Sequence, residues 1–222
     1  MIDVIPSILV KTKDEFLTQI NELKHVITHV QFDIADGIFV PNTTWSEPEI
    51  VRKINGYTFE LHLMVHSPLE TIAKWKDVDS VTRFIIHTES TTHLEDTIEH
   101  ARAYGRELFV AFNPYTPLDI LDTISAKIDG VLFMGVEPGF QGQKLIPEVL
   151  EKIIHCRKRH PHLYTELDGG VSEEVLESIA KSGVHAICPG SLVFGREHPA
   201  HEQIVFIKNQ LEKLDRACRQ AR

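Results

Sequence analysis

The pattern that most constrains this chain is a repeated alternation of short apolar runs with longer amphipathic stretches. Eight apolar runs, at 4–9, 30–34, 59–65, 84–87, 108–113, 131–136, 164–168 and 186–189, are each followed by a turn or a helical pattern. Runs such as 131–134 are continuously apolar, which is typical of parallel strands covered on both faces. Eight strand–helix units in 222 residues predict an α/β fold, a single-domain (β/α)8 TIM barrel over residues 1–222.

Helix-start signals agree with this alternation. Thr12 and Glu15 have the spacing of a capping box, in which each side chain bonds the other residue's backbone N–H. Ser67-Pro68 and Thr116-Pro117 each place a cap residue before a proline, which favours a first helical turn at that point. The last predicted helix carries apolar residues at helical spacing, namely Ile204, Val205, Ile207, Leu211 and Leu214.

An open, doubly wound sheet is the competing architecture. The turn at residues 9–12, after the first apolar run, lacks the glycine-rich fingerprint with which such sheets bind dinucleotides. No composition break or linker indicates a second domain. We therefore prefer the barrel and expect its active site at the carboxyl ends of the strands.

Charge and cysteine content restrict the partners. A net charge of −9 argues against nucleic acid and anionic membrane surfaces as partners. No apolar run reaches the roughly 20 residues of a membrane span, and residues 1–11 show no signal-peptide pattern. Cys156, Cys188 and Cys218 lack metal-type spacing, so we expect buried or incidental thiols and a cytoplasmic protein.

Polar residues at the predicted strand ends form a candidate site. Asp33, His62 and Asp168 come from three strands that can converge on the barrel axis, and they offer two oxygens and a nitrogen to a divalent metal. Two carboxylates on either side of a flat substrate could also move a proton from one face to the other. Each residue alone could equally be a structural polar group at a strand end.

Three glycine-containing loops follow the last strands and suggest phosphate binding. They are 139–142, 168–170 and 189–191, and glycine allows backbone N–H groups to approach an anion closely. Barrels of this kind bind phosphate with the loops after their last two strands. The alternative is that the glycines only make tight turns.

A series of motifs then resembles a known family. In order along the chain they are Pro6-Ser7-Ile8-Leu9, Asp33-Ile34-Ala35-Asp36-Gly37, Phe39-Val40-Pro41-Asn42, His62-Leu63-Met64, Asn113-Pro114, Val136-Glu137-Pro138-Gly139-Phe140, Asp168-Gly169-Gly170 and Gly190-Ser191. The chain resembles the ribulose-phosphate 3-epimerase family over nearly its whole length. The resemblance implies that the barrel is of the ribulose-phosphate-binding type.

The resemblance implies an isomerase of the pentose phosphate pathway that interconverts D-ribulose 5-phosphate and D-xylulose 5-phosphate. It implies Asp33 and Asp168 as the two acid/base residues, and one divalent ion (zinc, iron(II), manganese or cobalt) on Asp33, His62, Asp168 and the less certain Gln31. A homo-oligomer is a further option. The substrate contacts carried over are Ser7, His62, Met134, Gly139, Phe140, Gln141, Gly142, Gly169, Gly170, Gly190 and Ser191.

Four positions depart from the family pattern. Gln31 stands where the family has a fourth, histidine ligand, Ala35 replaces a methionine, Ile38 a histidine and Gln141 a glycine. Three explanations stay open: an epimerase with weakened or altered metal preference, an epimerase of another ketose phosphate such as a hexulose 6-phosphate, or a sugar-phosphate-binding homologue without catalysis. A decarboxylase of the orotidine-monophosphate type is disfavoured, because Ala35 stands where that class has lysine.

Two further carboxylates, Glu60 and Glu166, precede His62 and Asp168 by two residues. Strand parity turns them to the same side, one layer deeper in the barrel. We expect them to orient the metal ligands, and the alternative is an ion pair in the barrel core.

Overall fold

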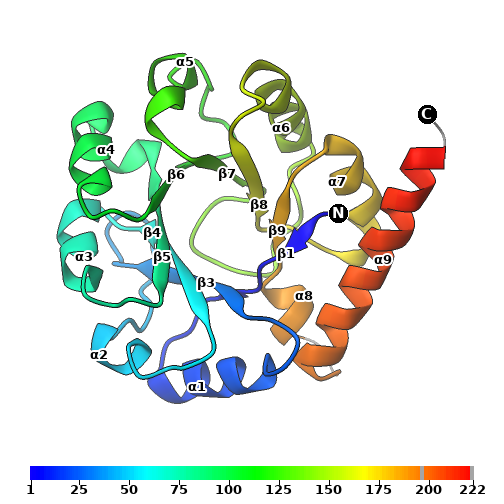
Figure 1. Ribbon diagram of the computed structural model, residues 1–222, viewed down its shortest axis with the longest axis horizontal. Coiled ribbons are helices and arrows are strands. Elements are labelled where there is room, and N and C mark those ends of the chain that lie inside the picture. The colour runs from blue at the N-terminus through cyan, green and yellow to red at the C-terminus, as the bar shows by residue number, and fades with distance from the viewer. Residues whose placement is uncertain (196–197, 221–222) are drawn as a thin grey trace.

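Parallel strands form the centre of the computed structural model, which describes residues 1–195 and 198–220, and helices surround them (Figure 1). The strands are β1 (Asp3–Val4), β2 (Ser7–Ile8), β3 (His29–Ala35), β4 (Thr58–Met64), β5 (Val81–His87), β6 (Glu107–Phe112), β7 (Gly130–Met134), β8 (Tyr164–Asp168) and β9 (Ala186–Cys188). Each pairs in parallel with its neighbours in the sheet.

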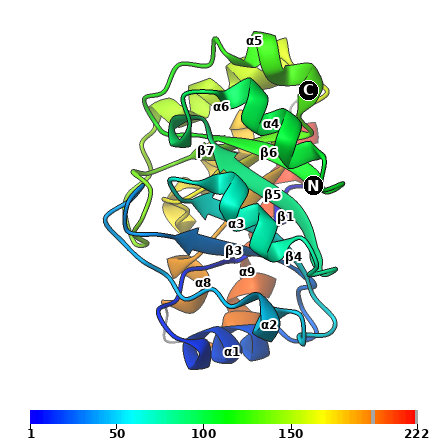
Figure 2. The same ribbon diagram turned by 90° about the vertical axis from the view of Figure 1, so that its left-hand side faces the viewer.

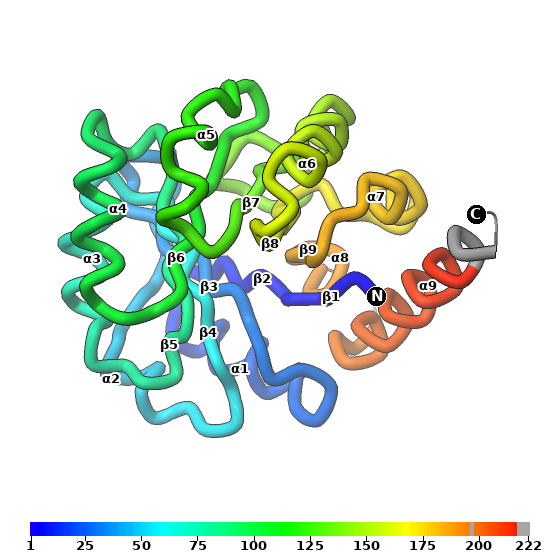
Figure 3. The backbone as a smooth tube through the Cα atoms, turned by 45° about the horizontal axis from the view of Figure 1, so that its top comes forward, coloured from blue at the N-terminus to red at the C-terminus, as the bar shows by residue number. Residues whose placement is uncertain are grey.

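The predicted first strand, residues 4–9, is two short strands instead of one. Pro6 has no N–H to donate to a sheet ladder, and it lies at the break. β1 pairs with β9 and β2 pairs with β3, so this one segment closes the ring (Figure 3). Ser7 N donates to Pro189 O at 3.2 Å and Gln31 N donates to Pro6 O at 3.0 Å across the two junctions. The predicted barrel is confirmed.

Helices follow the strands and cover the outside of the barrel. The α-helices are α1 (Lys13–Glu22), α2 (Pro48–Val51), α3 (Pro68–Trp75), α4 (Leu94–Arg102), α5 (Leu121–Ile124), α6 (Glu148–Arg159), α7 (Leu176–Ser182), α8 (Ser191–Phe194) and α9 (Ala200–Gln220). Short 3₁₀ turns lie at η1 (Thr88–Ser90), η2 (Ser125–Lys127) and η3 (Glu173–Val175). The turn α8 lies where the sequence indicated only a glycine loop.

The helix-start signals have mixed outcomes. The Thr12–Glu15 capping box is present with both bonds, and α3 begins at Pro68 although Ser67 makes no side-chain cap bond. The start predicted at Thr116-Pro117 is wrong, because the Thr116 hydroxyl donates to the Glu89 carboxylate and α5 begins only at Leu121. In α9, Val205 is exposed, whereas the other predicted positions pack against the core.

The core has two shells. The larger lies between the strands and the helices, and a smaller one fills the barrel with Ile85, Phe109, Leu132 and Met134 among its members. Cys156 and Cys188 are buried free thiols, as expected, whereas the Cys218 side chain lies outside the described residues. None of the helices that the structure describes is long and apolar enough to cross a membrane.

The direction of the strands decides where polar side chains gather. Because all strands are parallel, their carboxyl ends meet at one end of the barrel. The loops after β3 and β7 extend beyond that same end in the side view (Figure 2). This end is where the sequence predicts the site.

Candidate active site

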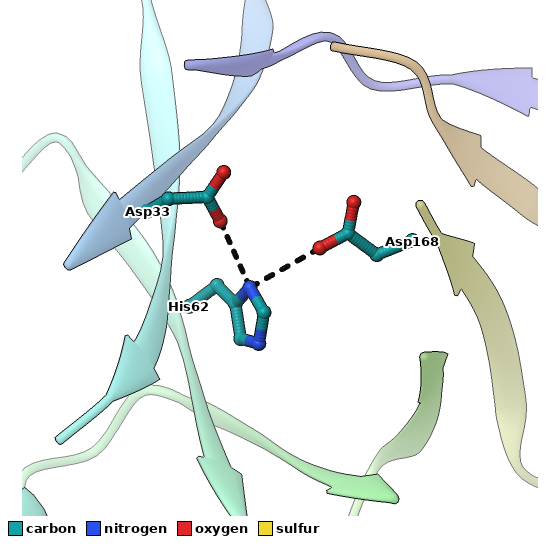
Figure 4. A group of neighbouring side chains, drawn as sticks. All are labelled: Asp33, His62 and Asp168. Carbon is teal, nitrogen blue, oxygen red and sulfur yellow. Dashed lines mark hydrogen bonds and ion pairs between the residues drawn. The ribbon is translucent and has the colours of Figure 1, made fainter. Parts of the chain in front are cut away.

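Asp33, His62 and Asp168 meet at the carboxyl end of the barrel (Figure 4). They lie on β3, β4 and β8, and the sheet register places Asp33 directly opposite His62. The Nδ1 atom of His62 is 2.8 Å from Asp33 Oδ1 and 3.2 Å from Asp168 Oδ2. All three side chains are buried. The structure therefore brings together three residues that are up to 135 positions apart in sequence, from Asp33 to Asp168.

Gln31 joins the same group from one layer below. Its amide nitrogen donates to Asp33 Oδ1 at 3.1 Å and to Asp168 Oδ2 at 3.0 Å. The amide oxygen is buried and has no hydrogen-bond partner in the described part of the chain. An acceptor left unpaired in a buried site costs about 1–3 kcal/mol, which a bound cation or water can relieve.

These donors fit a divalent metal ion. Ligand atoms of Asp33, His62 and Asp168 all lie within 4.8 Å of one another. Two carboxylates and an imidazole match the donor chemistry of first-row divalent ions. Rotating the Gln31 amide would exchange its nitrogen for the unpaired oxygen and offer a fourth, neutral donor, and the placement of amide N and O is an assignment.

Burial and mutual proximity shift the proton affinities of the cluster. Burial and the neighbouring Asp168 carboxylate raise the pKa of Asp33 to about 6, against the hydrogen bonds from His62 and Gln31. Burial by itself lowers the pKa of His62, but the hydrogen bonds to Asp168 and Asp33 raise it to about 10. A carboxyl group that titrates near neutral pH is suited to both taking up and giving back a proton.

A pocket opens above Asp33 and Asp168 and encloses about 450 Å³, including its open mouth. The predicted substrate contacts line this pocket, with the exception of His62, which lies buried beneath it. They are Ser7, Met134, Gly139, Phe140, Gln141, Gly142, Gly169, Gly170, Gly190 and Ser191. Leu9, Met64, Val136, Gln143, Val171 and Cys188 also line it. The three predicted glycine loops therefore share one pocket with the two aspartates.

Some of the pocket glycines are also needed for the path of the chain. Gly169 has a φ of +87°, and a Cβ there would lie 2.5 Å from Val136 Cγ2. At Gly190, an added Cβ would overlap the Gln141 amide, whose nitrogen donates to Ser7 O at 3.2 Å. Gln141 thus reaches across the pocket to the first strand.

Glu60 and Glu166 do not contact the three clustered residues by any hydrogen bond within the described ranges, so the expectation that they orient the ligands is wrong. Arg83 Nη1 lies 2.6 Å from Glu60 Oε2 and 2.6 Å from Glu166 Oε1, and its guanidinium stacks over Phe109 at 3.9 Å. Arg83 on β5 was not singled out from sequence. It makes the barrel-core ion pair that was the alternative.

A second imidazole lies beside the cluster, at a predicted strand end for which no role was expected. His87, at the end of β5, has its Nε2 atom 2.8 Å from His62 Nε2. Its Nδ1 atom lies 3.3 Å from Glu89 Oε2. Burial lowers the pKa of His87, so its ring is neutral at neutral pH. A histidine and a glutamate two positions apart at a strand end are the signal that could have identified the pair.

The Glu89 carboxylate is ionised. Although burial by itself raises the pKa of Glu89, hydrogen bonds from His87, Thr116 and the Asn113 N–H lower it to about 2. It therefore acts as an acceptor toward its neighbours.

The fold and this cluster define a TIM-barrel protein with an acid/base and metal-type site at the carboxyl ends of its strands. Solved structures share the fold. A 3-hexulose-6-phosphate synthase from Salmonella typhimurium has a TM-score of 0.69 at 12% identity, over 95% of this chain and 100% of that one. An orotidine 5'-phosphate decarboxylase from Pyrococcus horikoshii has a TM-score of 0.66 at 15% identity, over 94% and 99%. Identities this low show the fold alone.

Sequence comparisons are more specific. The model of the ribulose-phosphate 3 epimerase family matches residues 3–194. Ribulose-phosphate 3-epimerases from Schizosaccharomyces pombe and Bacillus subtilis are 34% and 33% identical to the chain. The first match covers 86% of this chain and 85% of the relative, and the second covers 88% and 94%. The chain belongs to the ribulose-phosphate 3-epimerase family, as its motifs indicated, and it is an enzyme of the isomerase class.

Proposed function

We propose that this chain interconverts D-ribulose 5-phosphate and D-xylulose 5-phosphate by moving a proton at C3 of the sugar. The observation that carries the proposal is the pair Asp33 and Asp168, whose carboxylates approach the same His62 nitrogen from β3 and β8 at 2.8 and 3.2 Å. One carboxylate takes the C3 proton from one face of the substrate, and the other returns a proton to the opposite face. The bound epimer decides which aspartate acts first.

The protonation of the cluster supports this exchange. Asp33, with its pKa raised to about 6 by burial and by Asp168, can hold or release a proton at neutral pH. His62 lies between the two carboxylates and reduces the electrostatic repulsion between them. Without an ion, the Gln31 amide nitrogen holds one oxygen of each carboxylate in place.

We propose one divalent metal ion at Asp33, His62 and Asp168, with the Gln31 oxygen as a fourth donor. Such an ion supplies Lewis-acid stabilisation of negative charge on the substrate oxygens, worth several kcal/mol. Zinc, iron(II), manganese and cobalt are the candidates. Because an amide oxygen replaces an imidazole in this donor set, we favour manganese over zinc.

The glycine loops 139–142, 168–170 and 189–191 would receive the phosphate end of the substrate, with Ser7, Met134 and Phe140 beside the sugar. We propose that residues 1–222 act as a single domain in the pentose phosphate pathway, in the cytoplasm. A cytoplasmic isoform among the relatives, from Oryza sativa, supports that location at 35% identity. We also propose that the chain forms a homo-oligomer and that it has no nucleic-acid or membrane partner.

The decisive experiment is C3 proton exchange into deuterated solvent with D-ribulose 5-phosphate. The protein is stripped of metal and resupplied separately with zinc, iron(II), manganese or cobalt. We expect metal-dependent exchange and formation of xylulose 5-phosphate. Asp33→Asn and Asp168→Asn should each lower the rate of epimerisation by about 10²–10⁴-fold, the usual contribution of a general acid or base, and one of the two should keep C3 exchange from this epimer.

Other outcomes of the same experiment distinguish the alternatives. Full conversion of D-ribulose 5-phosphate to D-xylulose 5-phosphate by the Asp33→Asn protein would exclude the two-base assignment. No exchange with any metal, while the sugar phosphate still raises the melting temperature, would favour a binding protein or an enzyme for another ketose phosphate. A hexulose 6-phosphate, tested in parallel, separates those two.

A further inference from the structure

His87 has a place in the structure that the proposed reaction does not use. Its side chain is fully buried at the end of β5, and its Nε2 atom is 2.8 Å from His62 Nε2. The two rings are stacked, with centroids 5.0 Å apart and an interplanar angle of 25°. The other nitrogen of His62 is the one that faces Asp33 and Asp168. His87 therefore contacts the side of His62 that points away from the aspartates.

The partners on either side determine which nitrogens carry protons. Two imidazole nitrogens at hydrogen-bond distance share one proton, so one Nε2 must donate and the other accept. Glu89 Oε2 lies 3.3 Å from His87 Nδ1, and a carboxylate only accepts, so Nδ1 of His87 carries a proton. With Nδ1 donating to Glu89, His87 offers the lone pair of Nε2 to the nitrogen that faces it, and it accepts the hydrogen bond of His62 Nε2–H.

Glu89 is itself fixed in position. Its other oxygen accepts the backbone N–H of Asn113 at 2.9 Å and the hydroxyl of Thr116. The Phe39 ring covers His87 with centroids 4.8 Å apart. Residues that follow β6 thus fix the outer end of the hydrogen-bonded series Glu89–His87–His62. The direction of its hydrogen bonds therefore has little freedom to reverse.

We propose that His87 and Glu89 are positioning residues that hold His62 in the tautomer with its lone pair on Nδ1. The Nδ1 atom of His62 is then available to a cation between Asp33 and Asp168, and the His62 ring cannot rotate away from that position. This inference rests on the proposed metal function of the site. Neither His87 nor Glu89 touches the ion or the substrate in this arrangement.

The test measures metal affinity, since turnover alone would not isolate the effect. Metal-free protein is titrated with Mn²⁺ and with Zn²⁺ in competition with a chelating dye. His87→Phe keeps a buried ring but leaves the His62 Nε2–H without an acceptor, and we expect about 10–100-fold weaker binding, as for other outer partners of metal ligands. His87→Gln supplies an amide acceptor and donor, and we expect it to restore affinity to within a few-fold.

A matched control separates this effect from the loss of any buried histidine. His160 is buried and lies 3.3 Å from Asp122, away from the pocket. His160→Phe should leave metal affinity unchanged, even where it lowers the melting temperature. Equal weakening by His87→Phe and His160→Phe would reduce His87 to a structural residue and overturn the proposal.

Nitrogen-15 NMR of the imidazole rings gives a second readout that needs no metal. We expect His87 to have its proton on Nδ1 and an unprotonated Nε2, and the reverse tautomer overturns the proposal. The two proposals fail differently. Unchanged metal affinity in folded His87→Phe overturns this inference alone. Unchanged metal affinity in folded His62→Ala overturns the proposed metal site and this inference together.

Discussion

At the scale of single residues, Gln31 distinguishes this site from one built on a second imidazole. Its amide nitrogen bonds both aspartates, and its buried oxygen has no hydrogen-bond partner among the residues that the structure describes. Amide and carboxylate oxygens suit manganese and magnesium, whereas imidazole favours zinc, iron and copper. One side chain therefore determines whether the fourth donor beside Asp33, His62 and Asp168 is an oxygen or a nitrogen.

Replacing this amide tests its effect on metal choice. We expect Gln31→His to bind zinc at least about tenfold more tightly, because an imidazole replaces a neutral oxygen, and to change manganese affinity less. Competition titrations with both ions measure the ratio. Gln203→His, at another buried glutamine with an unpaired oxygen, is the control and should bind both ions as the unaltered protein does. An unchanged zinc-to-manganese ratio in Gln31→His would contradict the assignment.

Gln141 affects a different part of the pocket. Its side chain lies against Gly190 and donates to Ser7 O, so it occupies space beside the proposed phosphate loops. Removing it by Gln141→Gly should lower KM about 2–10-fold, the equivalent of one neutral hydrogen bond that the substrate no longer has to displace. We expect little change in kcat, since Gln141 has no bond to the aspartates.

Steady-state kinetics measure the effect of Gln141→Gly, with Gln143→Gly as the control. Gln143 bonds two carbonyls of its own loop, so that variant loosens the loop while Gln141 stays in place. A raised KM in Gln141→Gly would mean that its amide binds the substrate instead of competing with it.

At the scale of elements, Arg83 joins its own strand to three other strands of the barrel. It lies on β5 and bonds Glu60 on β4 and Glu166 on β8, with Glu107 on β6 at its outer side. Burial and the nearby Glu60 carboxylate raise the pKa of Glu166 well above its ordinary value, and Arg83 opposes that rise. The layer below the active site is therefore held by one cation shared among carboxylates.

Removing that cation should destabilise the barrel. Arg83→Met removes the cation beside buried Glu166 and leaves Glu60 with His29 Nε2 at 3.0 Å, which we expect to lower the free energy of unfolding by about 3 kcal/mol or more. Denaturant titrations at neutral pH measure it. Arg106→Met is the control, because the Asp79 partner of Arg106 is fully exposed, and its effect should stay within about 0.5 kcal/mol. Equal stabilities of the two variants would show that the Arg83 layer contributes nothing.

At the scale of the whole molecule, the candidate site joins parts of the barrel that are distant in sequence. β3, β4 and β8 each supply a side chain to one cluster, so a bound ion would cross-link the barrel and stabilise only the folded chain. At an ion concentration of 100 times the Kd, the gain is about 2.7 kcal/mol. This gain depends on pH because ion and proton compete for His62.

The stability of the metal-free protein should therefore fall as the pH rises, whereas the stability gained by binding metal should grow and offset that fall. The pKa of His62 is raised from 6.5 to about 10 in the metal-free fold by its hydrogen bonds to Asp168 and Asp33, which outweigh burial. Its stabilising contribution is then fully present below about pH 6.5 and is lost as the pH rises toward 10. Metal affinity should instead rise about tenfold per pH unit over that range, because each ion displaces one proton.

Thermal unfolding between pH 6 and 9, with and without Mn²⁺, measures both slopes. We expect the metal-induced rise in melting temperature to grow with pH. His62→Ala should lose both the metal-induced rise and its pH dependence. A shift in melting temperature that is independent of pH would place the ion away from His62.

Sequence periodicity alone determined the barrel, and strand parity placed Asp33, His62 and Asp168 at its carboxyl end. Both are local or topological properties, because side chains alternate along a strand and parallel strands end together. The glycine loops were found for the same reason. Their order along the chain already assigns them to the last strands.

Contacts between distant segments were decided only by the tertiary structure. The split of the first strand at Pro6, the capture of Arg83 by Glu60 and Glu166, and the bond from Thr116 to Glu89 each depend on a partner more than twenty positions away. The same holds for the Gln31 amide, which faces Asp168 across the barrel. Which of several polar partners a side chain meets depends on distances across the barrel, and no local pattern in the sequence encodes them.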